Sequence, residues 1–219
     1  CPGSEQQQPI LEPQMMLGST HETTGSSSEH PLSSSSSLSS RSDGVPAIFL
    51  SHSGKQKPFV ENLFSALQTA NHTAFFDQHT LPEGSTFPNS ITTAARGCEV
   101  GVVVLSEDFL TSTWPMIELE ILVLQRRAAD PKAKVLPLFY KLRPADLKSP
   151  DNLSRWRQVW EENARTSDVV VKWGEALRAL KKYKGEIFTQ GKSEALHINK
   201  VVHTLCKMVP SPLLEDLSK

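Results

Sequence analysis

The chain has 219 residues, of which 38% are hydrophobic and 21% are charged, and its formal net charge is -1. This length allows one α/β domain with an attached segment and excludes two full domains. No run approaches the roughly 20 apolar residues that span a bilayer, so we expect a soluble chain without a membrane partner. The cysteines Cys1, Cys98 and Cys206 lie far apart. This spacing excludes a disulfide scaffold and favours a reducing compartment, the cytoplasm first and the nucleus as the alternative.

The charge is distributed unevenly along the chain. Up to Gln125 there are 4 Lys and Arg against 13 Asp and Glu, and from Arg126 onward there are 19 against 11. A basic half can indicate nucleic-acid binding. Here the basic side chains of residues 172–184 are interleaved with acidic ones, as on a solvated helix face, and no recognition motif accompanies them. We therefore do not expect a nucleic-acid partner.

Residues 1–45 differ in composition from the rest of the chain. Eleven of the seventeen residues from Ser26 to Ser42 are serine, and no aromatic residue precedes Phe49. Such a segment cannot bury enough apolar surface to offset the entropy of ordering it. We expect three parts, namely a disordered Ser-rich segment (1–45), a folded domain (46–209) and a C-terminal tail or linker (210–219).

Four continuous apolar runs predict strands, at residues 46–51, 73–77, 100–105 and 135–140. Helices are predicted at residues 59–67, 89–96, 115–127, 152–164, 170–184 and 194–208. Continuous rather than alternating apolar runs are typical of strands covered on both faces. Strict alternation of strands and helices predicts an α/β fold with a parallel sheet and helices on both faces.

Two details concern the end of the predicted sheet. Pro137 cannot donate to a ladder, so the fourth strand is expected near an edge or with a bulge. Residues 185–193 resemble a phosphate-binding loop but have five residues between the glycines where that motif needs four. We interpret them as a turn into the last helix and leave a short fifth strand open.

A ligand site is expected at one edge of this sheet. In open parallel sheets, ligands bind beyond the C-terminal ends of the strands, where the strand order reverses. Three loops leave those ends, at residues 51–57, 78–88 and 106–113. In the order 2-1-3-4, strands one and three flank the reversal, so the first and third loops face each other.

The third loop leads into a helix that carries a candidate carboxylate. Pro115 fits the first turn of that helix. Glu118 lies four residues after Trp114 and therefore on the same face. From spacing alone, the favoured interpretation of Glu118 is an acidic residue that complements the helix macrodipole. Glu120 points elsewhere and is expected to be solvated.

Five motifs occur in collinear order: Phe49-Leu-Ser-His-Ser-Gly54, Phe76-Asp77 with Leu81-x-x-Gly84, Val102-Val-Val-Leu-Ser106, Ser112-x-Trp-x-x-x-Glu118-Leu, and Val135-Leu-Pro-Leu-Phe-Tyr140 with Pro144-x-Asp146. Together they resemble the Toll/interleukin-1 receptor (TIR) domain. The plant type, as found in immune receptors and stand-alone TIR proteins, is the most similar. The resemblance covers residues 46 to about 209.

The resemblance implies a flavodoxin-like fold with strand order 2-1-3-4, self-association, and cleavage of NAD+ or NADP+ at the nicotinamide–ribose bond in immune or cell-death signalling. It assigns the catalytic carboxylate to Glu118. It implies no metal and no resident cofactor, because NAD+ or NADP+ is the substrate. The expected partners are other TIR domains and a nucleotide-binding receptor region in the same or another chain. The expected substrate-binding residues are Ser51, His52, Ser53, Gly54, Asp77, Ser112 and Trp114.

Some positions depart from the plant pattern. His52-Ser53-Gly54 stands where many members have Phe-Arg-Gly, so a basic residue is missing, for which Lys55 or Lys57 could substitute. The other departures are Glu83 for an Arg, Pro115 for a Cys and Ile117 for an acidic residue.

Two functions are consistent with these residues. For Trp114, a place in the hydrophobic core is the alternative to substrate binding. Glu118 favours an NAD+ nucleosidase, whereas the missing arginine favours a non-catalytic TIR interaction module. A receiver domain is disfavoured, because Ser51-His52-Ser53 stands where receivers have an acidic pair.

Overall fold

The computed structural model describes residues 45–77, 88–188 and 191–209. Expectations for residues 1–44 and 210–219, and for Leu81, Glu83 and Gly84 of the second loop, lie outside the described residues. Among the described helices, none combines the length and the apolar character needed to cross a bilayer.

The described residues form a five-stranded sheet in the order β2-β1-β3-β4-β5, and every neighbouring pair is parallel. The strands are β1 (Ile48–Ser51), β2 (Ala74–Phe75), β3 (Val100–Leu105), β4 (Lys134–Tyr140) and β5 (Glu186–Phe188). Every residue of β1 and β3 is buried. Their continuous apolar runs thus form the centre of the sheet, as the sequence predicts. The α/β class and the order 2-1-3-4 are confirmed.

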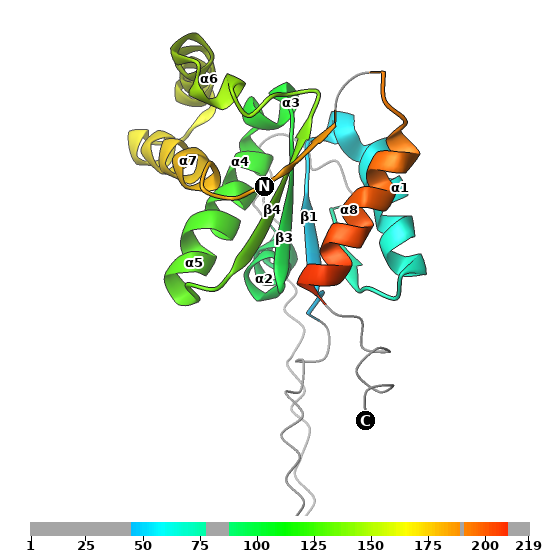
Figure 1. Cartoon of the computed structure of the whole chain (residues 1–219). Coiled ribbons are helices and arrows are strands. Elements are labelled where there is room, and N and C mark those ends of the chain that lie inside the picture. The colour runs from blue at the N-terminus through cyan, green and yellow to red at the C-terminus, as the bar shows by residue number, and fades with distance from the viewer. Residues whose placement is uncertain (1–44, 78–87, 189–190, 210–219) are drawn as a thin grey trace, which may run out of the picture. The chain divides into compact units, whose positions relative to one another are not determined.

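Helices cover both faces of this sheet (Figure 1). On one face, α1 (Lys57–Thr69) and α8 (Glu194–Met208) pack against each other and enclose one apolar cluster with the sheet. The second cluster lies under the helices of the other face. These are α2 (Asn89–Gly97), α3 (Glu107–Leu110), α4 (Thr113–Glu120), η2 (Ile121–Gln125), α5 (Arg126–Ala129), α6 (Pro150–Asn163) and α7 (Ser167–Leu180). Two short 3₁₀ turns, η1 (Gly54–Gln56) and η3 (Asp146–Lys148), complete the described elements.

The helix predicted at residues 115–127 is one continuous helical segment from Thr113 to Ala129, with a π-helical turn, η2, in its middle. This turn packs closely on the sheet. A Cβ added to Gly101 of β3 would meet Leu122 Cδ2 at 2.6 Å, so a larger residue at this position would force the Leu122 side chain to shift. Such π turns are frequent near functional sites, and this one directly follows the helix that carries Glu118.

The side of the sheet formed by β4 and β5 corrects one expectation and confirms another. Residues 186–188 form β5, so the interpretation of that stretch as part of a turn is wrong, whereas the fifth strand left open exists. Its brevity hid it, because Ile187 is 46% exposed and three residues show no periodicity. The expected position of the fourth strand near an edge is confirmed, since β4 lies next to the edge strand β5. The ladder from β4 to β5 begins at Leu138, one residue after Pro137.

Candidate active site

The first and third loops meet at the C-terminal edge of the sheet, where β1 and β3 end. Lys55 Nζ of the first loop lies 2.6 Å from Asp108 Oδ1 in α3. Gln56 Oε1 accepts a 2.7 Å hydrogen bond from the Ser106 hydroxyl. The expected juxtaposition of these two loops is therefore present. Lys55, one of the two lysines considered as substitutes for a missing arginine, is engaged with Asp108.

Glu118 lies at this same edge and contacts the end of β1. Its side chain is only 6% exposed, and its Oε2 accepts a 2.5 Å hydrogen bond from the Ser51 hydroxyl. It is the sixth residue of α4, whose first turn holds no acidic residue. The macrodipole interpretation is therefore wrong, because the favourable dipole interaction falls off beyond the first turn. The carboxyl faces another element of the fold instead.

The surroundings of Glu118 change its acidity. Burial raises the pKa of the carboxyl from its ordinary value to about 8, the hydrogen bond from Ser51 opposes this rise, and the charge of Asp77 adds to it. A buried carboxyl takes up a proton because low dielectric disfavours the charged form. Glu118 thus changes charge near physiological pH, which is a property of groups that take part in catalysis.

Asp77 and His52 lie beside this pair. His52 Nδ1 is 2.8 Å from the Ser53 carbonyl oxygen, and its ring contacts Phe76 with centroids 5.8 Å apart. Burial lowers the pKa of His52, so the neutral imidazole is favoured. Because a carbonyl only accepts, Nδ1 donates to Ser53 in this contact. Backbone hydrogen bonds with Ser53 and Asp77 both oppose the lowering of the pKa of His52.

Ser53, Gln56 and Ser106 form a second buried polar cluster. Of these three residues, only Ser53 is predicted from the sequence as a site residue. The hydroxyls of Ser53 and Ser106 both donate to Gln56 Oε1, and all three residues are buried. Ser53 therefore faces Gln56. Ser106 also caps α3 by accepting from the Phe109 amide at 3.1 Å. Ser106 is the polar end of the Val102–Ser106 motif, whereas no signal in the sequence singles out Gln56.

Of the remaining predicted residues, Ser112 and Trp114 lie at the start of α4, and Gly54 is the first residue of η1. Ser112 precedes α4 and donates to the Asp108 carbonyl oxygen at 2.6 Å. Trp114 is partly exposed, so the alternative of a core tryptophan is wrong. Gly54 is exposed, with open space where a Cβ would be. The buried tryptophans are Trp156, Trp160 and Trp173.

Two of these buried tryptophans hold the segment that precedes α4. The indole nitrogen of Trp156 donates to Glu107 Oε1 at 2.8 Å, and that of Trp160 donates to the Leu110 carbonyl oxygen at 2.6 Å. Both acceptors belong to α3. Helix α6 thereby fixes α3, and with it the start of the helix that carries Glu118.

Glu120, two residues after Glu118, points to other partners. Its Oε1 accepts from Gln125 Nε2 at 3.2 Å and lies 4.0 Å from Lys172 Nζ. The expectation that Glu120 points elsewhere is confirmed. The expectation of a merely solvated carboxylate is wrong, because this side chain is half-buried and paired.

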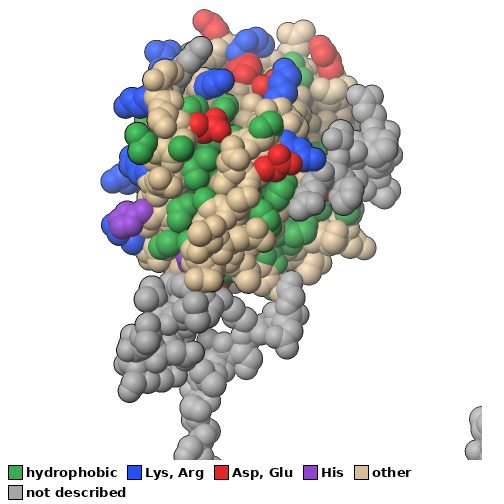
Figure 2. Space-filling view, turned by 90° about the vertical axis from the view of Figure 1, so that its right-hand side faces the viewer, with side chains coloured by type: hydrophobic (Ala, Val, Ile, Leu, Met, Phe, Trp, Pro, Cys, Tyr) green, Lys and Arg blue, Asp and Glu red, His purple; other side chains and the backbone are tan. Residues whose placement is uncertain are grey.

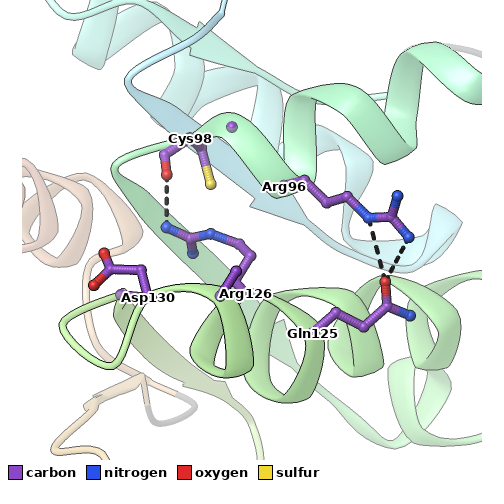
Figure 3. Close-up of a pocket in the computed structure, with 8 residues that line it drawn as sticks. Arg96, Cys98, Gln125, Arg126 and Asp130 are labelled. Carbon is purple, nitrogen blue, oxygen red and sulfur yellow. Dashed lines mark hydrogen bonds between the residues drawn. The ribbon is translucent and has the colours of Figure 1, made fainter.

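A hollow of about 430 Å³ lies at the opposite edge of the sheet, near the starts of β3 and β4 (Figure 3). The buried Arg126 donates from Nη2 to the Cys98 carbonyl oxygen at 2.6 Å and from Nη1 to the Lys134 carbonyl oxygen at 3.3 Å. Burial raises the pKa of the Cys98 thiol to about 11, so it is not a nucleophile at neutral pH. Arg126 thus links α5 to the start of β4 and to the segment between α2 and β3.

Known proteins were compared with this chain. A family model described as "TIR domain" matches residues 48–171. The disease resistance protein RPP4 of Arabidopsis thaliana is 28% identical over 185 residues, which cover 82% of this chain and 15% of that protein. The NAD(+) hydrolase PdTIR of Paracoccus denitrificans is 30% identical over 125 residues, which cover 57% of this chain and 41% of that protein. The chain thus spans less than half the length of these two relatives.

A solved structure is also similar. The TIR domains of the activated Roq1 resistosome superpose with a TM-score of 0.62 at 26% sequence identity. The similarity covers 73% of this chain and 99% of that chain.

Proposed function

The chain belongs to the TIR domain family, and we propose that it cleaves the nicotinamide–ribose bond of NAD+ or NADP+ in immune signalling, with Glu118 as the catalytic carboxylate. The observation that carries this proposal is the buried Glu118 carboxyl, bound by the Ser51 hydroxyl at the C-terminal edge of the sheet. Ligands of open parallel sheets bind at that edge. The names of relatives agree with the proposal, since one is an NAD(+) hydrolase and another a disease resistance protein.

One carboxylate suffices for this reaction. Ordinary glycosidases need a second carboxyl group to protonate the leaving group. Nicotinamide leaves from a cationic pyridinium ring: the bond from ribose C1′ to the ring nitrogen breaks, and its electron pair neutralises the ring. The oxygen of a water molecule then bonds to C1′ and releases its proton. The task of the protein is to stabilise positive charge on the ribose, which an ionised carboxylate in a sheltered position does well.

The substrate itself favours the ionised form of Glu118. The raised pKa keeps much of the free protein protonated at neutral pH. A pyridinium cation beside the carboxyl favours the charged form and lowers that pKa. The Ser51 hydrogen bond acts in the same direction. Binding of the cationic substrate and ionisation of Glu118 are thus coupled.

The test is release of nicotinamide from NAD+ and from NADP+ by concentrated purified protein, followed by chromatography. We expect wild type to be active and Glu118→Ala to lose about a hundredfold or more in rate, as removal of a preorganised electrostatic group commonly does. Glu120→Ala is the matched control, because it removes the same charge from the same helix while its own contacts lie with Gln125 and Lys172. Equal turnover in all three proteins would remove Glu118 from the mechanism.

A second candidate is a non-catalytic TIR interaction module, and the surface of α1 and α8 favours it. Figure 2 shows this side of the molecule, where hydrophobic side chains are exposed among basic and acidic ones. Leu196 of α8 is 71% exposed, the largest value among the exposed large hydrophobic residues described. We propose self-association through α1 and α8, which both candidates share. An inactive wild type that still self-associates would favour the interaction module.

A further inference from the structure

We infer that Gln56 is a positioning residue, which holds the first loop in the conformation that receives the ribosyl substrate. This inference rests on the proposed function. Gln56 is 7% exposed and lies in η1, between the end of β1 and the start of α1. Nothing in the sequence distinguishes it from a solvated glutamine, so its role comes from its contacts.

The carboxamide of Gln56 joins two loops through one oxygen atom. Gln56 Oε1 accepts from the Ser53 hydroxyl within its own loop and, at 2.7 Å, from the Ser106 hydroxyl at the end of β3. Both serines are buried, so neither hydroxyl can exchange this acceptor for bulk water without cost. Ser106 is itself fixed, since its oxygen caps α3. The first loop is thus hydrogen-bonded to the N-cap of α3, at the place where the strand order reverses.

The same residue reaches His52 through the Ser53 backbone. The Ser53 carbonyl oxygen accepts a hydrogen bond from the backbone N–H of Gln56 at 2.9 Å. The same oxygen lies 2.8 Å from His52 Nδ1. Ser53 therefore touches Gln56 through both its hydroxyl and its carbonyl. The position of Ser53 therefore fixes the imidazole of His52. We place the substrate on the His52 side of this network, with no direct contact to Gln56.

Ser51 and Gln56 have different roles at the C-terminal edge of the sheet. Ser51 belongs to β1, where its pairing with Val103 holds it, and its hydroxyl serves Glu118. Gln56 holds the first loop, which follows β1, through its hydrogen bonds with Ser53 and Ser106. Loss of the Gln56 oxygen should therefore weaken substrate binding and leave the carboxylate chemistry intact. The kinetic signature is a higher KM with little change in kcat, because the lost interaction contributes equally to ground state and transition state.

The experiment compares three substitutions in the full chain. Gln56→Met keeps the length of the side chain but lacks the acceptor, Gln56→Glu keeps acceptor oxygens, and Gln158→Met makes the same change on the exposed face of α6. The measurements are KM and kcat for NAD+ and amide hydrogen exchange of residues 52–56. We expect Gln56→Met to raise KM at least three- to tenfold, because one buried hydrogen bond of ordinary strength accounts for about that factor and Oε1 accepts two. Exchange at residues 52–56 should accelerate, whereas Gln56→Glu should lie nearer to wild type and Gln158→Met should match it.

A double-mutant cycle with Ser53→Ala tests the assigned partner. If Ser53 acts through Gln56, adding Ser53→Ala to Gln56→Met raises KM no further. Unchanged KM and exchange in Gln56→Met would overturn the inference, and so would equal defects in Gln56→Met and Gln56→Glu. If Gln56→Met does not fold, Ser53→Ala alone must show the higher KM and faster exchange.

The readouts separate this inference from the proposed function. If wild type releases no nicotinamide, the proposed function fails and the exchange measurement alone decides about Gln56. Faster exchange at residues 52–56 then supports its positioning of the loop, and unchanged exchange overturns it.

Discussion

The Ser51 hydroxyl donates a 2.5 Å hydrogen bond to Glu118 Oε2, although 67 positions separate the two residues in the chain. Ser51 is the last residue of β1, and Glu118 lies in the second turn of α4. Both side chains are buried, so this bond forms in a low dielectric, where it is stronger than in water. The pair joins the strand that ends at the candidate site to the helix that passes over it.

The first prediction concerns the stability of the fold as a function of pH. The pKa of Glu118 is raised in the folded state to about 8, so the folded state holds a proton that the unfolded state releases at lower pH. Its contribution is fully present below the ordinary pKa of a glutamate and is lost as the pH rises through about 8. Glu118→Gln stays neutral, so it should lose less stability than wild type between pH 5 and pH 9. Urea unfolding at both pH values measures this, and parallel losses in the two proteins would contradict it.

The second prediction concerns the hydrogen bond from Ser51. This bond lowers the pKa of Glu118, so Ser51→Ala should raise that pKa further. If activity needs the carboxylate, the midpoint of the pH–rate profile should move to higher pH, and turnover at pH 7 should fall. Ser53→Ala is the comparison, since the Ser53 hydroxyl binds Gln56 and should leave the midpoint in place. A midpoint that moves equally in both variants would exclude this specific effect of Ser51.

The third prediction concerns Asp77, which acts in the opposite direction. Its charge raises the pKa of Glu118, so Asp77→Asn should lower that pKa and move the pH–rate midpoint to lower pH. The same substitution tests the expected role of Asp77 in substrate binding, which would appear as a higher KM. A pH–rate profile between pH 5 and pH 9 at saturating NAD+ measures the first effect without the second. No movement of the midpoint would show that Asp77 is too well screened to matter.

The fourth prediction concerns self-association through α1 and α8. Leu196 is largely exposed on α8, so Leu196→Asp should weaken association and leave the melting temperature nearly unchanged. If assembly promotes catalysis, the specific activity of this variant should fall most at low protein concentration. Val171→Asp on α7 is the control, because Val171 is 50% exposed on a helix of the other face. Sedimentation velocity across a dilution series measures both variants, and equal weakening in the two would locate the contact elsewhere.

Much of the fold could be predicted because its strands are apolar on both faces. The runs at β1 and β3 are continuous since helices cover both sides of the sheet, and this pattern is visible without any tertiary information. The strand β5 could not be predicted, because only Phe188 of its three residues is buried. The π turn in η2 packs over Gly101 of β3, which is distant in sequence, and the local sequence does not indicate this turn.

At the candidate site, the residue types and their local spacing can be read from the sequence. Trp114 and Glu118 lie one helical turn apart whatever the rest of the chain does, because the helix period is a local property. The burial of Glu118 against Ser51, and the contacts of Glu120 with Gln125 and Lys172, depend on how distant elements pack. The reason is physical, since desolvation and hydrogen bonding of a side chain depend on elements that are distant in sequence and meet only in the folded sheet.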